Sequence, residues 1–123
     1  MLNLEQINVL GNILNTSWGK GNDETFSCTA IMQGDYLKIT YSTFANLASE
    51  SAISRQTPLL AQESSERISE LVSKTKKIFK EKTGSALPLK EQSNSDSVEL
   101  VQATSVNPRR IILYRRRAIF QVG

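Results

Sequence analysis

The chain has no histidine and only one cysteine, Cys28, among its 123 residues. The absence of histidine excludes Ser-His-Asp and Cys-His catalytic arrangements and every zinc site with a histidine ligand. A single cysteine forms no internal disulfide, and one chain cannot supply an all-cysteine zinc site. A magnesium or calcium site made of carboxylates alone is left open by composition, although no acidic loop with EF-hand spacing is present. The sequence therefore predicts a protein that is not an enzyme, with no cofactor, metal or small-molecule substrate.

Long apolar runs are also absent. No segment approaches the roughly 20 apolar residues that a membrane helix needs. Residues 1–5 have neither the basic region nor the apolar stretch of a secretory signal. Together with the lone cysteine, these features predict cytoplasmic synthesis in a reducing compartment and no contact with a membrane.

What is present is typical of a globular chain. Hydrophobic residues make up 39% of the sequence and charged residues 22%, so the chain can bury a core. The length predicts a single domain over residues 1–123. Within it we expect an N-terminal helix and loop over 1–23 and a hairpin–helix–hairpin unit over 24–122.

Charge is distributed unevenly along the chain, although the net charge is only +3. Residues 1–73 hold four basic and eight acidic side chains, a net charge of −4. Residues 74–123 hold eleven basic and four acidic side chains, a net charge of +7. Either the two halves neutralise each other in the fold, or the chain presents a basic region to an acidic partner.

The first half of the sequence predicts a helix and a hairpin. Residues 3–15 have helical apolar spacing, with Asn3 and Gln6 at the positions of a capping box. Residues 24–32 and 36–44 alternate between apolar and polar side chains, and the Gln-Gly-Asp segment between them suits a turn. These two segments predict a β-hairpin, in which Cys28 is a small buried residue rather than a nucleophile.

The middle of the chain predicts one long helix. Thr57 and Pro58 suit its first turn, and Gly84 suits its end. An apolar stripe at three-to-four spacing joins them. Residues 45–56 fit either a short helix or an irregular connection, and residues 84–96 predict a loop rich in Ser, Asn and Pro.

The last part predicts a second hairpin, with strands over 97–104 and 110–122 and a turn over 105–108. The fold class is therefore α+β: an antiparallel sheet of two β-hairpins, one long α-helix packed on one face and a short N-terminal helix. The strand order stays open. The expected core comprises Phe26, Cys28, Met32, Leu37, Ile39, Tyr41, Leu60, Ile68, Leu71, Ile78, Ile112, Phe120 and Val122.

Four arginines lie in the predicted final strand and a fifth, Arg109, precedes it directly. The interaction residues that we predict are the arginines Arg109, Arg110, Arg115, Arg116 and Arg117 and the helical lysines Lys74, Lys77 and Lys80. If the side chains of the last strand simply alternate, both faces mix arginine with apolar residues. A half-buried strand should instead have one apolar and one polar face.

Three interpretations of this strand compete. In the first, one face covers the helix and the other meets a partner subunit, with arginines at the rim. In the second, Arg115 and Arg117 beside Tyr114 and Phe120 form a nucleic-acid surface. In the third, a bulge near 115–117 changes the facing and leaves all the arginines in solvent.

These features favour a structural or assembly subunit of a larger complex, which binds protein subunits and forms a homo-oligomer. The Asn-, Ser- and Thr-rich composition is similar to that of small accessory proteins of virus particles, although no motif carries this likeness. A virus particle is therefore one candidate for the larger complex. The alternative function is a small nucleic-acid-binding module that uses the basic strand. It lacks the submotif of RNA-recognition domains and the Gly-x-x-Gly loop of KH domains.

Overall fold

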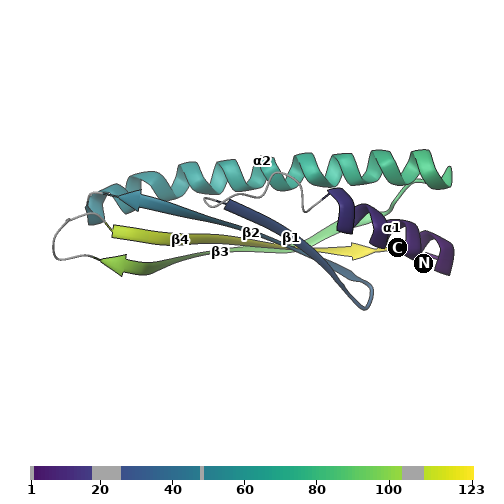
Figure 1. Ribbon diagram of the computed structural model, residues 1–123, viewed down its shortest axis with the longest axis horizontal. Helices are drawn as coiled ribbons and strands as arrows, with labels where there is room; N and C mark the ends of the chain where they lie inside the picture. Colours follow the sequence, from purple (N-terminus) through teal and green to yellow (C-terminus); the bar gives the residue numbers. More distant parts are fainter. Residues whose placement is uncertain (1, 18–25, 48, 104–109) are drawn as a thin grey trace.

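The computed structural model describes residues 2–17, 26–47, 49–103 and 110–123. A four-stranded antiparallel sheet carries one long helix along its length and a short helix at one end (Figure 1). The predicted α+β class, with two hairpins and one long helix, is confirmed. The elements are α1 (Leu4–Ser17), β1 (Phe26–Gln33), β2 (Tyr36–Leu47), α2 (Glu50–Thr83), β3 (Leu89–Ala103) and β4 (Arg110–Val122).

Helix α1 begins with the predicted capping box. The Asn3 side-chain oxygen accepts a hydrogen bond from the Gln6 backbone N–H at 2.8 Å, and the Gln6 side chain accepts one from the Asn3 N–H at 2.9 Å. Two N–H groups that lack helical partners are thereby satisfied. Leu10, Ile13 and Leu14 are buried against the sheet and α2. A helix of this length is marginal alone in water, so its stability comes from this packing.

Strands β1 and β2 form the predicted first hairpin. Their pairing is continuous, and Cys28 lies opposite Tyr41 with both side chains buried. Gly34 and Asp35 form the two-residue turn. Gly34 has φ of 60°, in the region that glycine enters at least cost. A glycine at the first central position suits the tight turns that match strand twist.

Helix α2 begins at Glu50, not at Thr57, so the predicted start was wrong. Ser49 is the N-cap, and its hydroxyl accepts a hydrogen bond from the Ala52 N–H at 3.3 Å. Pro58 lies inside the helix, where it removes one backbone bond. The Thr57 hydroxyl does not cap the helix but donates back to the Ile53 carbonyl at 2.7 Å. The prediction failed because threonine and proline also favour a first turn, whereas the cap that the structure uses is Ser49, earlier in the chain.

The 34 residues of α2 correspond to a length of about 51 Å, which spans the long axis of the molecule (Figure 1). The helix buries the predicted stripe: Ile68 and Phe79 are in the core, and the small polar residues Ser64 and Thr75 are fully covered. Gly84 ends the helix as predicted, with φ of 73° and its N–H bonded to the Lys80 carbonyl.

Strand β3 corrects the prediction of a loop over 84–96. It begins at Leu89 and runs for 15 residues to Ala103. Its first half is rich in Ser, Asn and charged residues, which are depleted in strands, and this composition caused the error. Pairing with β4 imposes the extended conformation, and two extra residues, Gln92 and Val101, interrupt the register as bulges.

Strand β4 occupies an inner position, because the strand order is β1-β2-β4-β3. It pairs with β2 over twelve residues and with β3 along the second predicted hairpin. The predicted turn over 105–108 lies outside the described residues. Both edges of β4 are hydrogen-bonded, so this strand cannot add to the sheet of a neighbouring subunit.

The core lies between α1, α2 and the inner face of the sheet. Of the predicted residues, most are buried or partly buried. Met32 is 37% exposed, so its placement in the core was wrong: it lies at the end of β1, next to the turn. The Phe26 side chain lies outside the described part of the structure. Residues that the prediction missed include Leu10, Ile13, Leu14, Val72, Phe79, Tyr114 and Ala118.

Replacing Gly84 by alanine tests the helix end. The new Cβ would meet no atom within 4 Å, so the cost comes only from the left-handed backbone, about 1 kcal/mol. We expect Gly84→Ala to lower the free energy of unfolding by this amount in urea titrations. The matched control is Gly11→Ala in α1, where the Cβ also meets nothing. There alanine should stabilise by about 0.5–1 kcal/mol. Equal effects of the two variants would contradict the assignment.

Candidate interaction surface on the open face of the sheet

The arginines of β4 lie on opposite sides of the sheet. The pairing of β4 with β2 is uninterrupted through 115–117, and the bulges of the second hairpin are on β3. The interpretation that a bulge near 115–117 changes the facing is therefore wrong. Tyr114, Ala118 and Phe120 are buried on the helix side, and Arg116, with a side chain 17% exposed, lies on the same side. Arg115 and Arg117 point to the other side.

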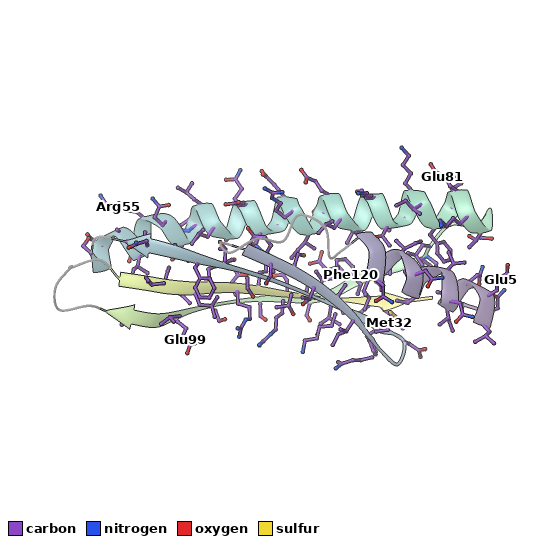
Figure 2. The ribbon with its side chains drawn as sticks, in the orientation of Figure 1. Glu5, Met32, Arg55, Glu81, Glu99 and Phe120 are labelled. Atoms are coloured by element: carbon purple, nitrogen blue, oxygen red, sulfur yellow. The ribbon has the colours of Figure 1, made fainter. Side chains whose placement is uncertain are left out.

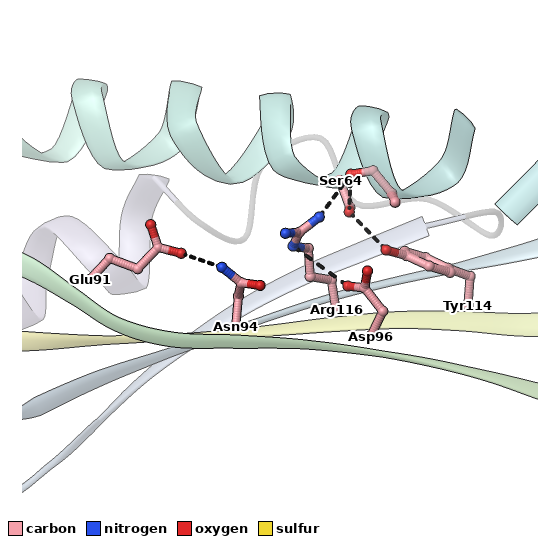
Figure 3. A network of polar contacts seen from close by, with 7 residues as sticks. Ser64, Glu91, Asn94, Asp96, Tyr114 and Arg116 are labelled. Carbon is pink, nitrogen blue, oxygen red and sulfur yellow. Dashed lines mark hydrogen bonds and ion pairs between the residues drawn. The ribbon is translucent and has the colours of Figure 1, made fainter. Parts of the chain in front are cut away.

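Arg116 connects three elements on the inner face (Figure 3). Its Nη1 donates to the Ala61 carbonyl of α2 at 3.0 Å. Its Nε lies 3.5 Å from the Asp96 carboxylate of β3, with the two side chains 17% and 36% exposed. These contacts hold the guanidinium between α2 and β3. There it also lines a hollow of about 280 Å³ together with Ile68, Asn94 and Phe120, and its role as a contact residue stays a prediction.

A second buried contact lies beside Arg116. The Ser64 hydroxyl donates to the Ala61 carbonyl at 2.9 Å and lies 3.3 Å from the Tyr114 hydroxyl, both residues being fully buried. Burial raises the pKa of the Tyr114 phenol above its ordinary value; the Asp96 carboxylate acts in the same direction, while Ser64 and Arg116 oppose it. The tyrosine is therefore held neutral as a hydrogen-bonding partner inside the core.

No helix of the described residues lies over the opposite face of the sheet (Figure 2). We call this surface the open face. On β2, Tyr36 and Phe44 are 45% and 49% exposed. Neighbouring strands add half-buried aliphatic side chains and a row of hydroxyl groups. Its side chains include Thr29, Tyr36, Lys38, Thr40, Ser42, Phe44, Ser95, Ser97, Leu113, Arg115, Arg117 and Ile119.

The open face is predominantly basic. Register places Lys38, Lys90, Arg115 and Arg117 on it, and Glu99 is its acidic member among the described residues of the strands. The two arginines are two residues apart on β4, about 7 Å along the strand. Arg115 Nε donates to the Ser42 hydroxyl at 3.4 Å. Within the described part of the chain, no carboxylate lies at ion-pair distance from either arginine.

One end of the open face is hollowed. A depression of about 380 Å³ lies between β2 and β3, above β4. Tyr36 and Lys38 form one wall and Ile119 lies between the walls; Gln33, Gln92 and Ser93 complete the lining. The aromatic and aliphatic lining suits a bulky apolar side chain of a partner. The lysine beside it suits a carboxylate next to that side chain.

The predicted interaction residues do not form one surface. Lys74, Lys77 and Lys80 are exposed on α2, the helix that lies along the inner face of the sheet (Figure 1), whereas Arg115 and Arg117 lie on the open face. The fold separates these two groups because α2 covers the inner face. Arg109 and the Arg110 side chain lie outside the described residues.

The structure adds residues that sequence reasoning did not select. Tyr36, Lys38 and Phe44 belong to the open face, whereas Tyr114 and Phe120, the aromatic residues predicted beside the arginines, are buried on the other side. The alternation of 36–44 already placed Lys38 opposite Leu37 and Ile39. The sequence did not show that β2 is the neighbour of β4, and so it did not join Lys38 to the arginines.

Cys28 is 4% exposed in the core. Burial raises the pKa of its thiol to about 12, so the thiolate is not populated near neutral pH. The prediction that Cys28 is a buried apolar residue is confirmed.

Among the described residues, no group of three or more Cys, Asp or Glu side chains is arranged to hold a metal ion. In the same part of the chain, no helix has the length and apolar character to cross a membrane. No protein-family model, curated protein or solved structure matches this chain.

Substituting Arg116 and Arg117 one at a time tests whether these neighbouring residues of β4 lie on opposite faces of the sheet. We expect Arg116→Met to lower the free energy of unfolding by about 1–2 kcal/mol, because it removes a charge-assisted bond to Ala61 and the ion pair with Asp96. Arg117→Met, one residue away on the exposed face, should change it by less than about 0.5 kcal/mol. Urea unfolding followed by circular dichroism measures both. Equal losses would contradict the opposite facing.

Cys28 provides a chemical test of the core. The thiol in the folded protein should react with Ellman's reagent at pH 8 only slowly, and rapidly after guanidinium unfolding. Because the folded pKa, about 12, lies above the ordinary 9.0, the neutral thiol stabilises the fold fully below pH 9. This contribution should be lost as the pH rises from 9 to 12. Cys28→Ala should weaken that part of the pH dependence of unfolding.

Proposed function

We propose that this protein is a non-catalytic assembly subunit that binds an acidic partner protein through its open face. The observation that carries the proposal is a sheet face on which Lys38, Arg115 and Arg117 lie between the exposed aromatic side chains of Tyr36 and Phe44, uncovered by any helix of the described residues. Arginine and aromatic residues are enriched at the centres of protein interfaces. The guanidinium groups of Arg115 and Arg117 suit bidentate pairing with carboxylates.

The hollow at Tyr36 and Lys38 supports the same function. Interfaces derive most of their binding energy from a few anchors that fill pockets, surrounded by contacts that exclude water. The hollow would accept one apolar anchor of the partner. Arg115 and Arg117 would set its orientation through their charges. The serine and threonine hydroxyls between them suit polar contacts.

One observation favours nucleic acid as the second candidate. Tyr36 and Phe44 are eight residues apart on β2, about 26 Å, and Lys38, Arg115 and Arg117 lie between them on the same face. Aromatic side chains that flank cations on an open sheet suit single-stranded nucleic acid, with bases stacked and phosphates paired. We favour protein because aliphatic residues such as Leu113 and Ile119 share the face, and they add no stacking.

Anisotropy titrations with two fluorescent probes test the proposal: a short Glu-rich peptide with a single tryptophan, and oligothymidylate. We expect the peptide to bind, weakening as salt rises, and Arg115→Gln/Arg117→Gln to weaken it at least about tenfold, or about 1.4 kcal/mol. The matched control is Lys77→Gln/Lys80→Gln on α2, which removes the same charge from the other side and should leave binding unchanged.

The outcomes separate the candidates. Binding of oligothymidylate alone, lost in Tyr36→Leu/Phe44→Leu, would replace the protein partner by nucleic acid. An equal effect of the lysine and arginine pairs would show nonspecific charge attraction and contradict the open face as the site. A wild-type chain that binds neither probe at low salt would also contradict it.

A further inference from the structure

The sheet ends in two edge strands, β1 and β3, neither of which pairs with a further strand among the described residues. An edge strand offers backbone N–H and C=O groups to any extended segment, and proteins protect such edges with charges, bulges and proline. The two edges of this sheet differ in that protection.

Strand β3 is protected. It carries four charged residues, Lys90, Glu91, Asp96 and Glu99. Two bulges interrupt its register, and bulges bend an edge away from a second strand. A long β3 is therefore unsuited to regular pairing with another chain.

Strand β1 has none of these protective features. Its sequence from Phe26 to Gln33 has no charged residue and no proline, and its pairing with β2 is continuous. Ile31 is 50% exposed and Met32 37% exposed. An uninterrupted, uncharged and partly apolar edge is the kind that adds a strand.

We propose that β1 pairs antiparallel with β1 of a second copy of this chain, so that the two sheets become one continuous sheet across a two-fold axis. This contact uses a different surface from the binding of an acidic partner, and each holds or fails without the other.

The sequence of β1 suits itself as the occupant. In an antiparallel two-fold pair, each side chain lies opposite one from the same face of the sheet. Around Thr29 and Ala30, the middle of β1, the side chains are small, so two copies approach without a clash. No charge opposes a like charge, which would destabilise the pair. Cys28 and Ala30 lie on the inner face and Ser27 and Thr29 on the outer face. Because both copies have this alternation, each face of one sheet continues into the same face of the other.

Light scattering on the full chain over a range of concentrations tests the proposal. We expect the wild-type mass to rise from that of one chain to twice that value. Ile31→Lys should lose the dimer at concentrations where the wild type is dimeric, because a lysine on an edge strand opposes pairing with another chain. The matched control is Val101→Lys on the β3 edge, where a valine of nearly equal exposure, 51%, is replaced; it should dimerise like the wild type.

Hydrogen exchange uses the wild-type protein, so its result does not depend on whether a variant folds correctly. Backbone amides of 26–33 should exchange more slowly as the concentration rises, whereas those of 89–103 should not change. A wild-type chain that stays monomeric at high concentration would overturn the proposal. So would a dimer that Val101→Lys breaks and Ile31→Lys does not, or protection that appears on β3. Arg115→Gln/Arg117→Gln should leave the dimer intact, which separates this contact from the acidic-partner site.

Discussion

The alternation of β4 is the constraint on which this molecule depends. The strand has neighbours on both edges, so its backbone is held by two ladders and each side chain has a fixed face. Arg116 is directed to the helix side, where it joins α2 to β3 through the Ala61 carbonyl and the Asp96 carboxylate. The same alternation places Arg115 and Arg117 outside. One run of three arginines thus serves both the interior and the surface.

A single layer of helices explains the open face. Helices α1 and α2 pack together over one side of the sheet, and each described strand therefore has one covered side and one that meets solvent or a partner. An antiparallel sheet tolerates this arrangement because its strands can be apolar on one face only. Here the uncovered side is not simply polar: aromatic and aliphatic residues lie among hydroxyl groups and cations. This mixture is the physical basis for proposing a partner.

The edges of the sheet add a second kind of surface. The exposed backbone of an edge strand can hydrogen-bond to an extended segment of almost any sequence. Selectivity therefore comes from features that prevent pairing, such as charges and bulges. Strand β3 combines charges with bulges, whereas β1 lacks both. A subunit with one open edge and one protected edge would form a closed pair rather than an extended array, because only one edge of each chain is used. The open face would remain available in that pair.

The sequence by itself determined the local structure wherever short-range chemistry was sufficient. The Asn3 capping box, the alternation around Gly34, the stripe of α2 and its end at Gly84 all depend on neighbours within a few residues, and each could be predicted. Burial of Cys28 followed from the same alternation. These features need no knowledge of what lies across the fold.

Tertiary structure decided the rest. Pro58 lies within α2 although proline favours a first turn, and the polar first half of β3 is a strand because β4 supplies its hydrogen bonds. The strand order, the separation of the lysines of α2 from Arg115 and Arg117, and the meeting of Lys38 with those arginines all depend on which strands are neighbours. Strand pairing joins residues that are far apart in the chain, and local sequence patterns do not determine which strands pair.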